Sequence, residues 1–90
     1  MSFLMELDEI ALREFESALE GFKQSVESRC NTLEGGIDGC SKFMKDESSQ
    51  KALNEGKATC DRIRSCLQTT DRLLELVRRT IRQMDNAPGM

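Results

Sequence analysis

Four cysteines are the residues of this 90-residue chain whose side chains are best suited to chemistry. They are Cys30, Cys40, Cys60 and Cys66, and the chain has no His, which excludes His-based catalysis and His metal ligation. A catalytic thiol needs a neighbouring base or a lowered pKa, and no residue pattern marks one cysteine as activated. The absence of a C-x-x-C pair disfavours a zinc site. We therefore expect no enzymatic activity and no metal or other cofactor.

Two structural roles for the cysteines remain open. In an antiparallel hairpin, facing residues lie at equal distances from the turn. The pairs Cys30 with Cys66 and Cys40 with Cys60 are centred on residues 48 and 50, so they allow two nested disulfides, each worth about 2–4 kcal/mol. The alternative is reduced thiols that pack as small hydrophobes. The spacing favours the reduced form, because the intervals on the two arms differ and both bridges would not have ideal geometry.

The first half of the chain has an apolar residue at every third or fourth position, which is typical of one face of an amphipathic helix. This stripe consists of Leu4, Leu7, Ala11, Phe15, Ala18, Phe22, Val26, Cys30 and Leu33. It continues in step through Ile37, Cys40 and Met44, past the glycines of the segment 35–39. The pattern predicts a helix that is not interrupted by these glycines.

The second half carries a stricter pattern of alternating three- and four-residue spacings, which is typical of coiled-coil packing. The seam consists of Leu53, Gly56, Cys60, Ile63, Leu67, Thr70, Leu74, Val77, Ile81 and Met84. The residues that we expect to pack the two helices together are Leu53, Cys60, Ile63, Leu67, Leu74, Val77 and Ile81.

Two segments between the stripes are candidates for a turn. A turn at 35–39 would use the glycines but leave arms of unequal length. A turn at about 45–49 gives nearly equal arms, which bury more of both stripes. We therefore predict a helix over about 3–44 with a weak joint at 35–39, and a second helix over about 49–86. Three helical glycines cost about 3 kcal/mol, which packing on a partner would offset.

The expected fold class is all-α, with residues 1–90 forming a single domain. The domain is an antiparallel two-helix hairpin with coiled-coil-like packing that associates into a four-helix bundle. A two-helix hairpin has little interior, so apolar residues remain on its outer faces. We therefore expect a protein partner, either a second copy or a helical heteropartner. The residues expected to contact the partner are Phe15, Phe22, Phe43 and Leu76.

Charge and hydropathy exclude other classes of partner. The net charge is −3, with 5 Lys/Arg and 11 Asp/Glu in residues 1–50 and 8 and 5 in residues 51–90. The two halves would attract each other in a hairpin or between two chains lying head to tail, and the alternative is that both are ordinary solvated faces. An acidic chain with few aromatic residues is a poor nucleic-acid binder. No apolar run approaches the roughly 20 residues of a membrane span. The first residues lack the basic region of a cleavable signal peptide, so we expect a cytoplasmic protein or one secreted without such a peptide.

The predicted hairpin resembles the WXG-type small proteins of bacterial type VII secretion. These are helical hairpins of similar length that pair into four-helix dimers, with Trp-x-Gly at the turn and often Tyr-x-x-x-Asp/Glu near the C-terminus. Phe43 and Lys45 stand at the Trp and Gly positions. Ile81 and Asp85 have the spacing of the Tyr-x-x-x-Asp/Glu motif, with Ile in place of Tyr. The resemblance implies a small secreted protein or the helical partner of a larger secreted toxin, with Ile81 and Asp85 as its export signal.

Two alternative functions remain. The first is an intracellular coiled-coil adaptor, secretion chaperone or assembly subunit, which needs only the hairpin and a protein partner. The second is a disulfide-stapled hairpin of an oxidising compartment. Cys30 and Cys40 form a C-x9-C pair similar to that of helical-hairpin proteins of the mitochondrial intermembrane space, whereas Cys60 and Cys66 depart from it with C-x5-C.

Overall fold

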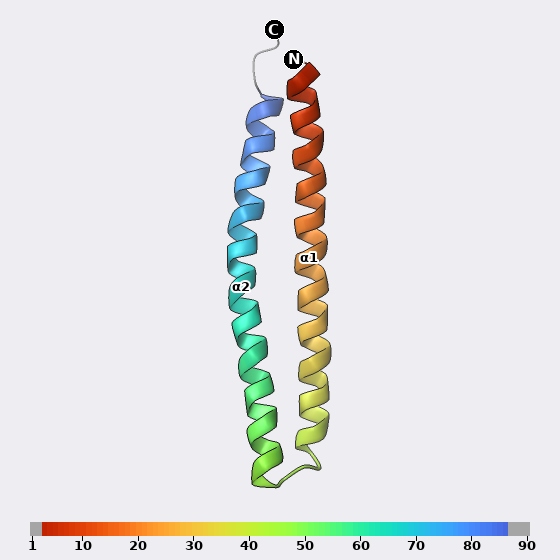
Figure 1. Cartoon of the computed structure of the whole chain (residues 1–90), viewed down its shortest axis with the longest axis vertical. Coiled ribbons are helices and arrows are strands. Elements are labelled where there is room, and N and C mark those ends of the chain that lie inside the picture. The colour runs from red at the N-terminus through yellow and green to blue at the C-terminus, as the bar shows by residue number, and fades with distance from the viewer. Residues whose placement is uncertain (1–2, 87–90) are drawn as a thin grey trace.

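The chain forms two long antiparallel helices joined by a short loop (Figure 1). The computed structural model describes residues 3–86, with side chains described from residue 6 onward. Helix α1 spans Phe3–Ser41 and helix α2 spans Glu47–Asp85. The two helices pack against each other along their length in a molecule of 69 × 15 × 14 Å. The predicted all-helical hairpin is therefore correct.

Helix α1 ends three residues earlier than the predicted boundary at about residue 44. The backbone N–H groups of Phe43 and Met44 both donate to the carbonyl oxygen of Cys40, at 3.0 and 2.8 Å. These bonds satisfy a carbonyl that would otherwise lack a partner at the helix end. Lys45 adds a hydrogen bond from its Nζ to the carbonyl oxygen of Ser41. The loop at 42–46 therefore begins before the predicted turn.

Helix α2 begins at Glu47, two residues earlier than predicted, because Asp46 caps it. The Asp46 backbone is extended, and its side chain accepts a hydrogen bond from the backbone N–H of Ser49 at 2.9 Å. A carboxylate in this position satisfies one of the free N–H groups of the first turn. Glu47 adds a negative charge where the helix dipole favours it.

Helix α1 runs through its glycines without a break, so the alternative turn at 35–39 is wrong. Gly35, Gly36 and Gly39 have no positive φ, as expected for residues inside a right-handed helix. Ile37, between them, reaches Gly56 of α2: a Cβ added at Gly56 would lie only 3.1 Å from the Ile37 Cδ1 atom. The missing side chain at Gly56 thus lets the two helices approach closely near the loop.

The core is a single line of side chains between the two helices. Its buried members are Cys30 from α1 and Cys60, Leu67, Leu74, Val77 and Ile81 from α2. Two residues predicted for this packing are less buried. Leu53 is half-buried, and Ile63 is 37% exposed in a groove that it lines together with Val26 and Cys30 of α1.

Helix α1 departs from the predicted stripe only in its first half. There Leu12 and Leu19 are half-buried, whereas Phe15 and Phe22 are 44% and 56% exposed. Further along, the stripe residues Val26, Cys30, Ile37 and Cys40 are buried or half-buried, as predicted. The predicted stripe joined two adjacent apolar lines into one. Charged side chains beside the inner line, Glu16, Glu20 and Lys23, make ion pairs with α2.

Candidate functional site

Apolar side chains follow one long edge of the hairpin, beside the contact between the helices. We call this surface the apolar edge. Its members are Ala11, Phe15, Ala18, Phe22 and Leu33 on α1 and Ile63, Leu73 and Met84 on α2. Met84 is half-buried, and the other large side chains are between 37% and 56% exposed. Contiguous exposed apolar surface of this kind is a common sign of an interaction site.

Two shallow grooves show that both helices contribute to this edge. Near the end that carries the termini, Phe15 of α1 lines one groove together with Thr80 and Met84 of α2. Nearer the loop, Leu33 of α1 lines a second groove together with Ile63 of α2. Side chains of a partner can therefore insert between the helices at two separate levels.

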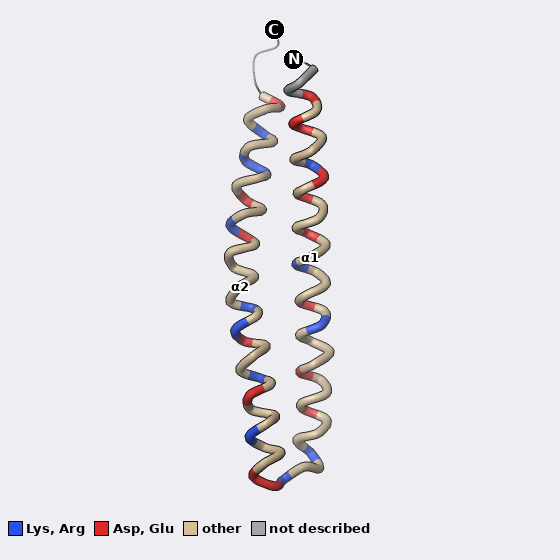
Figure 2. Tube along the Cα trace, viewed as in Figure 1, with Lys and Arg blue, Asp and Glu red and all other residues tan. Residues whose placement is uncertain are grey.

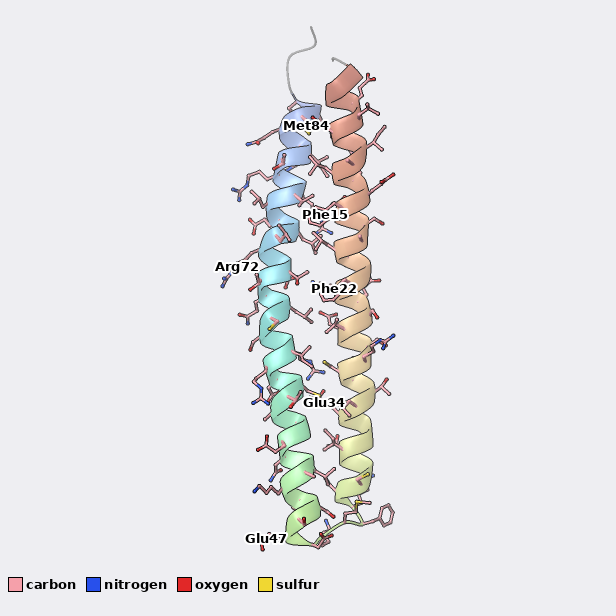
Figure 3. The ribbon with its side chains drawn as sticks, viewed as in Figure 1. Phe15, Phe22, Glu34, Glu47, Arg72 and Met84 are labelled. Carbon is pink, nitrogen blue, oxygen red and sulfur yellow. The ribbon has the colours of Figure 1, made fainter. Side chains whose placement is uncertain are left out.

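Phe22 and Leu73 occupy the stretch between the two grooves. Phe22 follows Phe15 by about two helical turns and so shares its side of α1. Leu73 precedes Thr80 by the same interval and shares its side of α2. Figure 3 shows Phe15 and Phe22 near the line along which the helices meet, whereas Arg72 points away from α1.

Ion pairs between the helices close the opposite edge, which we call the charged edge. The pairs are Arg13–Asp85 at 2.9 Å, Lys23–Asp71 at 2.7 Å, Arg64–Glu34, and Arg78 with Glu16 at 2.8 Å and Glu20 at 2.9 Å. Two residues along a helix turn through about 200°, so Arg13 and Glu20 lie across the helix from Phe15 and Phe22. Figure 2 shows such charges distributed along both helices.

Arg64 anchors the charged edge near its middle. Its guanidinium donates to a Glu34 carboxylate oxygen at 2.6 Å and to the side-chain oxygen of Asn31 at 2.8 Å. The hydrogen bond from Arg64, and then its positive charge, lower the pKa of Glu34. At the start of α2, hydrogen bonds from Ser49 lower the pKa of Asp46. The folded state therefore holds both carboxyl groups in their ionised form.

These two shifts predict that acid destabilises the hairpin. A carboxyl group whose pKa is lowered by folding stabilises the fold above its ordinary pKa and loses that contribution as the pH falls. The free energy of unfolding should therefore decrease between about pH 5 and about pH 3. Glu34→Gln should lower stability near neutral pH and make this decrease shallower, as measured by urea unfolding at each pH. Glu14→Gln, at an exposed position, is the control; an equally shallow profile in both variants would contradict the assignment to Glu34.

All four cysteines are free thiols, which is the form that the spacing favours. Cys30 and Cys60 are both buried between the helices. Cys66 is exposed and Cys40 is half-buried. Neither of the two disulfides that the spacing allows, Cys30 with Cys66 and Cys40 with Cys60, is present in the described part of the chain. Distance from the turn sets the level of a residue along the hairpin, but not its side of the helix.

The predicted partner-contact residues fall in three places. Phe15 and Phe22 belong to the apolar edge. Leu76 is 55% exposed and, two residues after the buried Leu74, lies on the side of α2 that faces away from α1. Phe43 lies in the loop, where it is 85% exposed. The apolar edge therefore unites two of these residues, and Leu76 and Phe43 are separate.

The two residues that the resemblance marks as an export signal have different surroundings. Ile81 is only 4% exposed and packs in the core. Asp85 stays at the surface, where its carboxylate accepts a hydrogen bond from Arg13 at 2.9 Å. In the folded hairpin only Asp85 is available for recognition by another protein.

Sequence reasoning placed Leu33 and Ile63 in the inner packing, and so missed their contribution to the edge. The sequence does contain a signal for this placement. Glu34 follows Leu33 and Arg64 follows Ile63, so the residues after the two apolar side chains carry opposite charges. Complementary charges at the same level of a hairpin favour facing positions, which turns the preceding residues toward the other edge.

The structure indicates no metal site or membrane span in the part of the chain that it describes. Residues 3–86 contain no group of three or more His, Cys, Asp or Glu side chains arranged to hold a metal ion. Neither α1 nor α2 combines the length and apolar character needed to cross a membrane. No protein-family model, curated protein or solved structure matches the chain.

Proposed function

We propose that this protein is a non-enzymatic protein–protein interaction module whose apolar edge binds helices of a partner. The observation that carries the proposal is the contrast between the two long edges. Ion pairs join the helices on one edge, whereas the other presents Phe15, Phe22 and Leu33 to solvent along two grooves. Burial of these apolar side chains would supply the free energy of association.

The size of the edge suits a stable interface. The molecule measures 69 × 15 × 14 Å, so one long face offers on the order of 1,000 Å². A standard interface buries about 800 Å² on each partner. Phe15 and Phe22 are aromatic and near the contact line of the helices, as is typical of residues that dominate binding energy.

A second copy of the chain is the partner that we propose. Two hairpins meeting edge to edge would form a four-helix bundle with a twofold axis, the commonest symmetry of protein oligomers. The heptad spacing of Cys60, Leu67, Leu74 and Ile81 on α2 supports coiled-coil-like packing in such a bundle. A helical heteropartner would use the same surface and the same physical interactions.

Salt dependence tests which edge mediates association. Sedimentation velocity at about 0.1 M and about 1 M NaCl compares an apolar with an electrostatic interface, because salt screens exposed charges. We expect the dimer to persist or to tighten at high salt. Dissociation of the dimer at high salt would mean that the charged edge forms the interface. A monomer under both conditions would contradict self-association.

The resemblance to WXG-type proteins supports a finer proposal, namely a protein exported by type VII secretion or the helical partner of an exported toxin. The equal lengths of α1 and α2 fit this architecture. We expect Asp85→Asn to block export, measured as secreted protein in a strain that carries a type VII system. Arg13→Gln is the matched control, because it breaks the same ion pair and leaves Asp85 in place. Equal export of both variants would contradict a role for Asp85 as a signal.

A further inference from the structure

A line of four side chains on α1 runs along the apolar edge and has a charged residue at each end. Asp8, Phe15, Phe22 and Arg29 follow one another at intervals of seven residues. Seven residues make about two helical turns, so all four lie on the same side of α1. The line therefore begins with a negative charge, continues with two aromatic rings and ends with a positive charge.

The two grooves of the apolar edge contain the charged ends of this line. Asp8 lines the groove near the termini together with Phe15, and Arg29 lines the groove nearer the loop together with Leu33. Among the side chains of residues 6–86, which the structure describes, none forms an ion pair with Asp8 or Arg29. Both charges are thus available to a partner that covers the edge.

We propose that a second copy of the chain packs on this line head to tail, with α1 of one copy antiparallel to α1 of the other. The inference rests on the proposed self-association through the apolar edge and adds its orientation and register. The four residues are evenly spaced, so a twofold axis midway between Phe15 and Phe22 sets each of these rings against the other ring of the second copy. The same axis sets Asp8 of each copy opposite Arg29 of the other.

The alternative orientation, with both loops at the same end, leaves these charges without opposite partners. A twofold axis along the hairpin sets α1 against α2 of the second copy at the same level. The ion pair between Lys23 and Asp71 defines the levels within one hairpin. Counting six residues from each member of this pair, Arg29 would face a part of α2 that lies one turn from the positive charge of Arg62. Head-to-tail pairing instead forms two pairs of opposite charge, which select the orientation while the aromatic rings supply most of the affinity.

Charge reversal in the full chain tests the orientation. Asp8→Lys places two positive charges opposite each other, and Arg29→Glu places two negative charges there. Each variant alone should therefore self-associate about 10-fold more weakly than the unsubstituted chain. An equimolar mixture of the two should form heterodimers as tightly as the unsubstituted chain forms its dimer, because opposite charges face each other again. Native mass spectrometry identifies the heterodimer by its mass, and sedimentation equilibrium gives the dissociation constants.

A single chain that carries both reversals gives a second measurement that does not depend on mixing. It should regain the dissociation constant of the unsubstituted chain, since each charge pair is restored with its sign exchanged. Lys and Glu are good helix formers, and circular dichroism checks that each variant keeps its helices. Arg72→Glu is the matched control, because Arg72 points away from α1 (Figure 3), and it should change the dissociation constant by less than about twofold.

Two results separate this inference from the proposed self-association. A dimer that both single reversals leave unchanged, or that neither the mixture nor the doubly substituted chain restores, would overturn the head-to-tail orientation while keeping the apolar edge as the interface. A monomeric unsubstituted chain would overturn both the orientation and the self-association.

Discussion

Leu74→Ala is expected to destabilise the hairpin by about 2–4 kcal/mol, a large share of the stability of so small a domain. Leu74 is only 2% exposed and lies in the line of side chains between the helices. Truncating it removes apolar burial and leaves a cavity that a two-helix structure can close only by moving one helix. Urea unfolding followed by circular dichroism measures the loss.

Leu73→Ala is the matched control, because the same substitution is made one residue earlier. Leu73 is 37% exposed on the apolar edge, so its truncation leaves the core intact. At a protein concentration where the chain is monomeric, we expect a loss below about 1 kcal/mol. Similar losses for the two variants would mean that the helices meet through a different face.

The double substitution Phe15→Gln with Phe22→Gln should weaken self-association by about 100-fold or more. Both side chains are about half exposed in the single hairpin and would become buried in the bundle. A twofold axis places each of them in the interface twice, which enlarges the effect. Gln is a good helix former, so α1 should keep its structure. Sedimentation equilibrium gives the dissociation constant of each variant.

Phe43→Gln tests whether self-association depends on the apolar edge or on any exposed apolar side chain. Phe43 is the most exposed of the large apolar side chains described, at 85%, but it lies in the loop and not on the apolar edge. We expect its substitution to leave the dissociation constant unchanged within about twofold. A loss as large as that of the double variant would show that association does not depend on the apolar edge.

The sequence was sufficient to predict the hairpin, because two long apolar stripes and a polar segment between them have few other arrangements. The heptad spacing of α2 also predicted that Leu67, Leu74 and Ile81 face inward. The helix ends were less certain from sequence. The Asp46 cap and the hydrogen bonds to the Cys40 carbonyl set them, and each depends on local geometry that spacing does not reveal.

The rotation of the first half of α1 could not be read from apolar spacing alone. Phe15 and Leu12 both belong to lines with spacings of three and four, and either line could face α2. The contacts of Glu16 and Glu20 with Arg78 accompany the observed rotation, which brings both carboxylates within reach of one guanidinium. Those contacts join residues about 60 positions apart in the chain, so their alignment requires the register of the folded hairpin.

The same limit applies to the cysteines. A simple count from the turn paired Cys30 with Cys66, but the rotation of α2 exposes Cys66 and turns Cys60 inward. Facing residues in a hairpin can be predicted from sequence only when both the level and the side of each helix are known.

Oxidative footprinting with hydroxyl radicals tests most directly whether the apolar edge is the interaction surface. The reduced protein is labelled over a range of concentrations, and mass spectrometry measures the oxidation of Phe15, Phe22 and Phe43. Our account predicts that Phe15 and Phe22 become protected as the concentration rises, while Phe43 reacts equally throughout. Oxidation of Phe15 and Phe22 that does not change with concentration, or protection of Phe43 alone, would contradict it.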